Sequence, residues 1–254
     1  MQKQTGAVIL AELLKAYGIT HIFMVPAVLR RTMVEIEKRT NIKRLHVHSE
    51  KSAAYMADGY ARASGKPAIC MAQVIGALNI AAGLRDAFLA HSPVIALTGG
   101  RDPKTKFKKV YQEIDDMPAF EPVTKFNATI DDVSRILDMI EQAFRVSISG
   151  SPGPVHLQLK GNEAQIDLEE SEFESNFKIS DTHIPPHRPI CNDILLHEAL
   201  NAIQSAQRPI IVAGGGTKYS KSSLELIEFA EKLNIPIATS LNGKDLIHSS
   251  HPLS

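Results

Sequence analysis

The chain has 254 residues, of which 44% are hydrophobic and 22% are charged, a composition that indicates a folded globular protein and argues against disorder. The 28 lysines and arginines balance the 28 aspartates and glutamates, so the overall charge points to neither a nucleic-acid partner nor a membrane surface. The two cysteines, Cys70 and Cys191, exclude a disulfide scaffold and a cysteine zinc site. No stretch reaches the roughly 18 apolar residues of a spanning helix, and we expect a reducing, cytoplasmic setting.

The first part of the chain alternates between helical and strand patterns. Apolar residues at helical spacing over residues 8–17, closed by Gly18, predict a helix. Predicted strands follow at 22–25, 45–47, 68–71, 94–97 and 154–159, and predicted helices at 49–63, 77–90 and 131–144. Strands that alternate with helices of this length predict an α/β fold, in which a parallel sheet is covered by helices on both faces.

A change of composition divides the chain. Residues 163–188 are rich in Glu, Ser, Asp and Pro and have little periodicity. We therefore predict a first domain over 1–165, a linker over 166–190 and a second α/β domain over 191–254. The second part reads as a helix at 192–205, a strand at 209–213, a three-glycine turn, a helix ending near 233 and a strand at 235–239. Because two strands make barely half of an open-sheet domain, we expect it to be truncated.

Glu50 stands where a predicted strand ends and a predicted helix begins. The helix dipole favours a carboxylate in the first turn, and open parallel sheets place their ligand crevices at this edge. Taken alone, such a residue is more often an ordinary acid at a helix start. The sequence around it points to a ligand site instead.

Residues 50–67 read Glu-x-x-Ala-x-x-Met-Ala-Asp-Gly-Tyr-Ala-Arg-x-x-Gly-Lys-Pro. This pattern closely resembles the cofactor-activating segment of the pyrimidine-binding domain in thiamine-diphosphate-dependent enzymes of the acetolactate-synthase-like group. Further similar segments follow the family's order, at residues 18–26, 76–79, 86–88, 92–99, 111–115, 122–125 and 153–157. The resemblance covers the chain from about residue 5 to its end.

The resemblance implies specific roles. Glu50 would hydrogen-bond N1′ of the cofactor's aminopyrimidine ring and so help to remove the thiazolium C2 proton, which needs a carboxylate that can hold or share a proton. Pro26, Ile75, Gly76 and Asn79 would contact thiamine diphosphate together with Glu50, and Gln112 would face the substrate. The cofactor would then act as the electron sink for decarboxylation and carboligation of a 2-keto acid.

The sequence departs from the family at two places beside this site. Most members carry Gly-Pro-Gly where this chain has Val74-Ile75-Gly76, and many carry glycine where it has Ala27. The loop that faces the cofactor is therefore bulkier. These departures support an alternative interpretation, a noncatalytic homologue that serves as a binding or assembly domain, whereas Glu50 within its motif opposes it.

Other partners also follow from the resemblance. The chain lacks the Gly-Asp-Gly motif with a downstream Asn that holds Mg²⁺ in the family, so Mg²⁺ would be held by a domain absent from this chain, and the isolated chain is expected to be inactive. Gly214-Gly215-Gly216 is interpreted as a structural turn, with FAD binding as the alternative. A homo-dimer or tetramer is implied, and the small residues Ala53, Ala54 and Ala57 either lie at that interface or pack on their own sheet.

Overall fold

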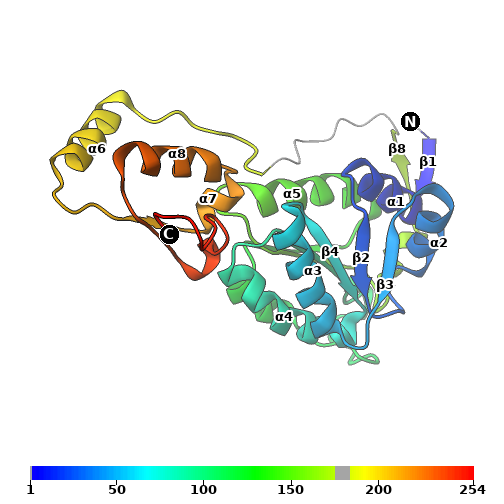
Figure 1. Ribbon diagram of the computed structural model, residues 1–254. Helices are drawn as coiled ribbons and strands as arrows, with labels where there is room; N and C mark the ends of the chain where they lie inside the picture. The colour runs from blue at the N-terminus through cyan, green and yellow to red at the C-terminus, as the bar shows by residue number, and fades with distance from the viewer. Residues whose placement is uncertain (1, 175–183) are drawn as a thin grey trace. The chain divides into compact units, whose positions relative to one another are not determined.

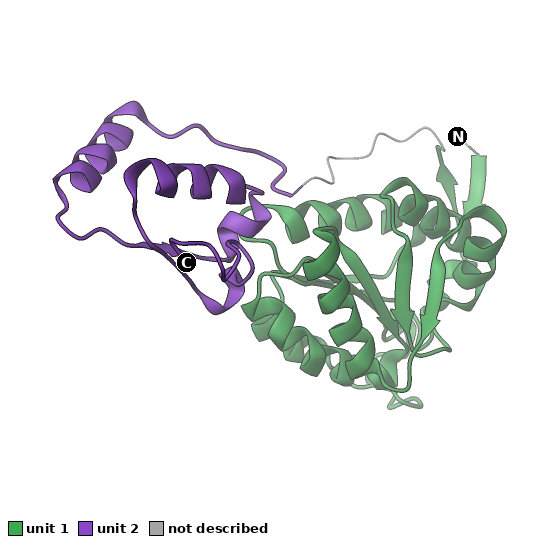
Figure 2. Cartoon of the chain, viewed as in Figure 1, with its two compact units in different colours: residues 1–183 green, residues 184–254 purple. Residues whose placement is uncertain are grey.

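The computed structural model describes residues 2–174 and 184–254. Contacts divide the chain into two compact units, Met1–His183 and Ile184–Ser254, which Figure 2 shows in different colours. Each unit has its own core. Among the described residues, no helix combines the length and apolar character needed to cross a membrane.

The first unit is built on a six-stranded parallel sheet in the order β3-β2-β4-β5-β7-β6 (Figure 1). Its strands are β2 (His21–Met24), β3 (Lys43–His46), β4 (Ala68–Ala72), β5 (Val94–Gly99), β6 (Phe126–Ile130) and β7 (Val155–Leu159). Every residue of β4, β5 and β7 is buried. Central strands of a parallel sheet are expected to be apolar throughout because helices cover both faces, and the predicted fold class is confirmed.

The helices form two layers on the sheet. The helices are α1 (Gly6–Ala16), α2 (Arg30–Arg39), α3 (Glu50–Ser64), α4 (Ala77–Leu89) and α5 (Ile136–Ile148). Alternate residues of a strand point to opposite faces. Accordingly, Ile69 of β4 packs in a core with α1, α2 and α5, while its neighbour Cys70 packs in a separate core with α3 and α4.

Several elements of the first unit escaped the sequence analysis. They are α2, β6, the pair β1 (Gln2–Thr5) and β8 (Glu170–Phe173), and six short 3₁₀ turns, η1 (Val74–Gly76), η2 (Pro103–Thr105), η3 (Met117–Ala119), η4 (Glu121–Val123), η5 (Val133–Arg135) and η6 (Gln165–Leu168). The helix predicted from residue 131 begins later, because Asp132 caps η5 and α5 starts only at Ile136.

The predicted linker also differs from the structure at its start. Residues 166–173 belong to the first unit, since η6 packs on α1 and β8 pairs antiparallel with β1. A four-residue strand whose partner lies at the far end of the unit's sequence leaves no local pattern to recognise. Residues 175–183 of the predicted linker lie outside the described residues.

The second unit contains α6 (Asp193–Ser205), β9 (Ile211–Ala213), α7 (Gly215–Tyr219), α8 (Ser223–Leu233), β10 (Ile237–Thr239) and the turn η7 (Leu241–Gly243). Strands β9 and β10 pair in parallel. The predicted order of helix, strand, helix and strand is confirmed. The three-glycine turn continues into the one-and-a-half-turn helix α7, and a Cβ on Gly215 would lie 3.1 Å from Cβ of Asn242, so close packing explains this glycine.

A buried histidine joins three segments of the first unit. His156 of β7 has no exposed surface; its ring lies 2.8 Å from Oγ1 of Thr98 through Nε2 and 2.7 Å from Oδ1 of Asn127 through Nδ1. Its ring stacks on Phe120 with centroids 3.4 Å apart. Because Asn127 donates its amide N–H to the carbonyl of Met117, its oxygen accepts from Nδ1–H, and Nε2 accepts from Thr98. This pattern requires a neutral ring, and burial lowers the pKa of His156 to about 3.

Acidification should therefore lower the free energy of unfolding, because His156 is neutral in the folded chain. The unfolded chain takes up a proton at His156 below about pH 6.5, whereas the folded chain does not until its pKa of about 3. We expect protonation of His156 to leave the free energy of unfolding unchanged above about pH 6.5 and to lower it by up to about 1.4 kcal/mol per pH unit below that pH. Urea unfolding from about pH 7 to about pH 5 should show that His156→Gln has a shallower pH slope than the wild type. His48→Gln, at an exposed histidine, should keep the wild-type slope, and equal slopes for all three proteins would contradict the assignment.

Candidate cofactor-activating site

The start of α3 places Glu50 at the carboxyl edge of the sheet. Ser49 caps the helix in extended conformation, and its Oγ accepts a hydrogen bond from the backbone N–H of Ser52 at 3.2 Å. Glu50 is the first helical residue, and the helix ends at Gly65 with a φ of 65°. The carboxylate thus lies in the first turn, as predicted, beside the ends of the central strands.

Three of the predicted site residues lie together. The amide Nδ2 of Asn79 donates to Oε2 of Glu50 at 3.0 Å. Gly76 lies directly against the same carboxyl group, since a Cβ there would be 2.7 Å from Oε1 of Glu50 and would overlap its Cγ. Any other residue at position 76 would therefore displace Glu50.

Close packing of two helices makes this arrangement possible. A Cβ on Gly83 of α4 would lie 2.6 Å from Cβ of Ala54 and 2.9 Å from the carbonyl oxygen of Lys51 on α3. Gly83 follows Asn79 by about one helical turn, so the same approach brings Asn79 to Glu50.

The structure also shows whether the three small residues of α3 lie at an interface or pack within the chain. Ala53, Ala54 and Ala57 have no exposed surface and pack within the chain.

The remaining cofactor-facing residues lie at the same edge of the sheet. Pro26 follows β2 and is exposed. Ile75, within η1 after β4, leaves 59% of its surface exposed between buried Val74 and Gly76. Because β2 and β4 are neighbours in the sheet, both residues lie near the strand ends that border Glu50. Among the described residues, the side-chain hydrogen bond to the Glu50 carboxylate comes from Asn79, not from Pro26 or Ile75.

Gln112 reaches this cluster through a residue that the sequence analysis missed. Gln112 lies in a loop, and its Oε1 accepts a hydrogen bond from Nε2 of Gln73 at 2.9 Å. Gln73 directly precedes η1, and three residues later Gly76 contacts Glu50. A polar residue immediately after a buried strand, beside Val74-Ile75-Gly76, was the signal in the sequence that could have identified it.

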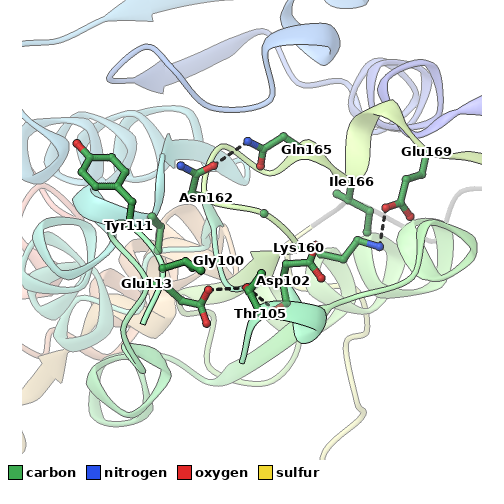
Figure 3. A pocket seen from close by; sticks show the side chains of 13 residues that line it. Gly100, Asp102, Thr105, Tyr111, Glu113, Lys160, Asn162, Gln165, Ile166 and Glu169 are labelled. Atoms are coloured by element: carbon green, nitrogen blue, oxygen red, sulfur yellow. Dashed lines mark hydrogen bonds and ion pairs between the residues drawn. The ribbon is translucent and has the colours of Figure 1, made fainter. Parts of the chain in front are cut away.

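A separate cavity of about 390 Å³ lies beside this cluster (Figure 3). Val74, which precedes Ile75 and Gly76, lines the cavity, and its backbone N–H donates to the carbonyl of Asn162 on the cavity wall. None of the predicted site residues lines this cavity. Six of its polar side chains pair with one another: Lys160 with Glu169 at 2.6 Å, Thr105 with Glu113 at 2.7 Å, and Gln165 with Asn162 at 2.7 Å. These six side chains therefore already have hydrogen-bond or ion-pair partners within the cavity wall.

Over residues 2–174 and 184–254, no group of three or more His, Cys, Asp or Glu side chains is placed to hold a metal ion. The described side chains therefore do not fit a Mg²⁺ site.

A carboxylate in the first turn of a helix, at the carboxyl edge of a parallel sheet and beside a required glycine, defines an α/β domain with a ligand site at its strand ends. Comparisons with known proteins identify the family. The model of the thiamine pyrophosphate enzyme N-terminal TPP binding domain matches residues 4–119, and that of the central domain of the same enzymes matches residues 196–254. The chain belongs to the thiamine pyrophosphate enzymes.

Relatives and solved structures agree with this assignment. A "Probable acetolactate synthase large subunit" of Methanococcus aeolicus is 34% identical over 98% of this chain and 42% of its own length. An "Acetolactate synthase" of Arthrospira platensis is 32% identical over 100% of this chain and 44% of its own length. An X-ray structure of a Mycobacterium smegmatis protein, assigned as a thiamin diphosphate-dependent enzyme, has the same fold, with a TM-score of 0.78 at 23% identity over 94% of this chain and 45% of that one. The chain thus spans less than half the length of these proteins.

Alanine in place of glycine at position 27 should lower the free energy of unfolding by a measurable amount. Ala27 has a φ of 81°, in the left-handed region that favours glycine. We expect Ala27→Gly to raise the free energy of unfolding by about 1 kcal/mol. Ala63→Gly, at an exposed position of α3, should instead lower it by about 0.5–1 kcal/mol. Urea unfolding measures both, and a loss of stability in both variants would show that the backbone at Ala27 is unstrained.

Proposed function

We propose that this chain is the N-terminal, pyrimidine-binding part of a thiamine-diphosphate-dependent enzyme that decarboxylates a 2-keto acid and joins the product to a second molecule, as acetolactate synthases do. The observation that supports this most directly is the Glu50 carboxylate, held by Asn79 and pressed against Gly76. The family membership and the similarity to acetolactate synthases point the same way.

The residues present fit the aminopyrimidine end of thiamine diphosphate. When bound, the cofactor supplies the electron sink that decarboxylation of a 2-keto acid requires. Asn79 donates to Oε2 of Glu50 and so fixes the plane of the carboxylate. The other carboxylate oxygen, Oε1, would be available to hydrogen-bond the ring nitrogen. The missing side chain of Gly76 leaves room for the Glu50 carboxyl group itself, and the exposed side chains of Ile75 and Pro26 would supply apolar surface for the ring.

Other features of the complete enzyme remain predictions. Mg²⁺ would bind to residues beyond those described, FAD at the three-glycine turn is the less favoured alternative to a structural turn, and a cytoplasmic setting is expected from composition. The noncatalytic interpretation rests only on Ala27, Val74 and Ile75, and the Glu50 cluster argues against it because an assembly domain needs no such carboxylate.

Replacing Glu50 tests this function directly. In the enzyme that contains this chain, Glu50→Gln should leave folding intact but lower turnover about 10²-fold or more, because a group that holds a proton is lost. Exchange of the cofactor's C2 proton, followed by NMR, should slow in parallel. The matched control is Glu141→Gln on α5, a half-buried glutamate outside the cluster, which should exchange at the wild-type rate. Wild-type exchange in Glu50→Gln would refute the proposed role.

A second copy of the chain is the proposed partner. The outer surfaces of α3 and α4, which carry Glu50 and Asn79, expose several large apolar side chains, among them Met56 (49% exposed) and Leu78 (45% exposed). Large exposed apolar side chains on the helices that carry a ligand site are typical of an interface. It also suits a family in which two subunits complete each site, and the proposal is a homo-dimer or a tetramer built from such dimers.

Two substitutions on α3 should separate interface from core. Met56→Glu should lower the dimer fraction and keep the circular dichroism spectrum, because it places a charge on the exposed face. Ala54→Arg should lose the fold, since no space exists between Ala54 and Gly83. Val34→Glu on α2, at a position 43% exposed, is the control for adding a charge elsewhere. Light scattering that reports an unchanged dimer in Met56→Glu would remove this face from the interface.

A further inference from the structure

The loop that carries Gln112 is held in an unusual backbone conformation. Gln112 has a φ of 63°, and Phe107 and Lys109 have φ values of 69° and 52°, all in the left-handed region without being glycine. Such conformations cost energy and persist where surrounding contacts determine them. Most of the loop is exposed, and Phe107 leaves 87% of its surface open, so few packing contacts can hold it.

The hydrogen bond from Gln73 is the contact that ties Gln112 to the sheet. It joins the two side-chain amides at 2.9 Å, and both residues are half-buried. The neighbours of Gln112 turn elsewhere: Tyr111 is mostly exposed, and Glu113 accepts from Thr105 in the adjacent cavity (Figure 3). Of these three residues, Gln112 is the one that hydrogen-bonds Gln73, the residue that precedes η1.

The direction of this hydrogen bond sets what Gln112 can offer to a ligand. Gln73 donates through Nε2, and Gln112 accepts through Oε1. One lone pair of the Gln112 carbonyl oxygen is thus engaged, while its two N–H donors have no bond to another group in the part of the chain that the structure describes. An amide fixed in this way presents donors and suits an acceptor such as a carboxylate.

The charge of the loop favours the same class of ligand. Residues 104–112 contain four lysines, Lys104, Lys106, Lys108 and Lys109, and no acidic residue, and Asp102, Glu113, Asp115 and Asp116 flank this run. A cluster of one sign beside a binding site raises the local concentration of ligands of opposite charge. The lysines of residues 104–112 thus favour an anion near the N–H groups of Gln112.

We propose that Gln73 is a positioning residue, which orients the Gln112 amide so that its N–H groups donate to the carboxylate of the 2-keto acid. This inference rests on the proposed function, because it takes the substrate to be bound beside Glu50. It assigns a role to Gln73 and explains why the site would prefer an acid to its neutral analogues, because the N–H groups of Gln112 would be held toward the carboxylate.

The test compares an acid with its methyl ester. In the enzyme that contains this chain, Gln73→Met keeps a side chain of similar length and removes the hydrogen bond. We expect the KM for the 2-keto acid to rise about 10-fold with kcat changed less. The inhibition constant of the methyl ester, which carries no charge, should stay within about 2-fold, whereas a general distortion of the site would weaken both ligands. Gln112→Met should show the same selective loss.

The control is a substitution in the neighbouring cavity. Gln165→Met removes an equivalent amide pair, Gln165 with Asn162, from the neighbouring cavity, and should leave both constants unchanged. If Gln73→Met does not fold, Gln73→Ala removes the same bond. Equal weakening of acid and ester, no weakening, or a selective effect in Gln112→Met alone would overturn the proposal. Exchange of the C2 proton should remain at the wild-type rate in Gln73→Met, so that failure here is distinguishable from failure of the Glu50 assignment.

Discussion

The close approach of α3 and α4 is the constraint on which the site depends. Gly83 has no side chain, and Ala54 and the carbonyl of Lys51 occupy the space that one would need. With the helices this close, Asn79 at the start of α4 reaches the carboxylate of Glu50 at the start of α3. A larger residue at position 83 would separate the helices and break that hydrogen bond, although it would touch neither residue.

The parallel sheet explains why residues distant in sequence meet at one edge. All six strands run in the same direction, so the segments that follow β2, β3 and β4 emerge on the same side, and Pro26, Glu50 and the η1 turn come together there. Gln112 joins them through its hydrogen bond to Gln73, because residues 106–116 around it form no strand or helix.

Buried polar groups anchor the segment that follows this loop. Asn127 and Thr98 hold the neutral ring of His156, Phe120 covers it, and Gln158 donates to Asp116 at 2.6 Å. Burial raises the pKa of the Asp116 carboxyl, which counteracts the acid sensitivity of His156 in part. One end of the loop is thereby attached to the sheet, and the Gln73 bond constrains its middle. Together these contacts give the exposed, lysine-rich segment a defined position beside the site.

Local pattern determined the alternation of strands and helices, the α/β class and the position of Glu50 at a helix start, because periodicity and capping act over only a few residues. The motif around Glu50 also pointed to the family and to Gly76 and Asn79. Tertiary structure alone decided that Ala54 faces Gly83 rather than a partner subunit, that β8 pairs with β1, and that Gln73 holds Gln112. Each of these depends on contacts between residues far apart in the sequence, and such contacts follow from how the layers pack, which no local pattern encodes.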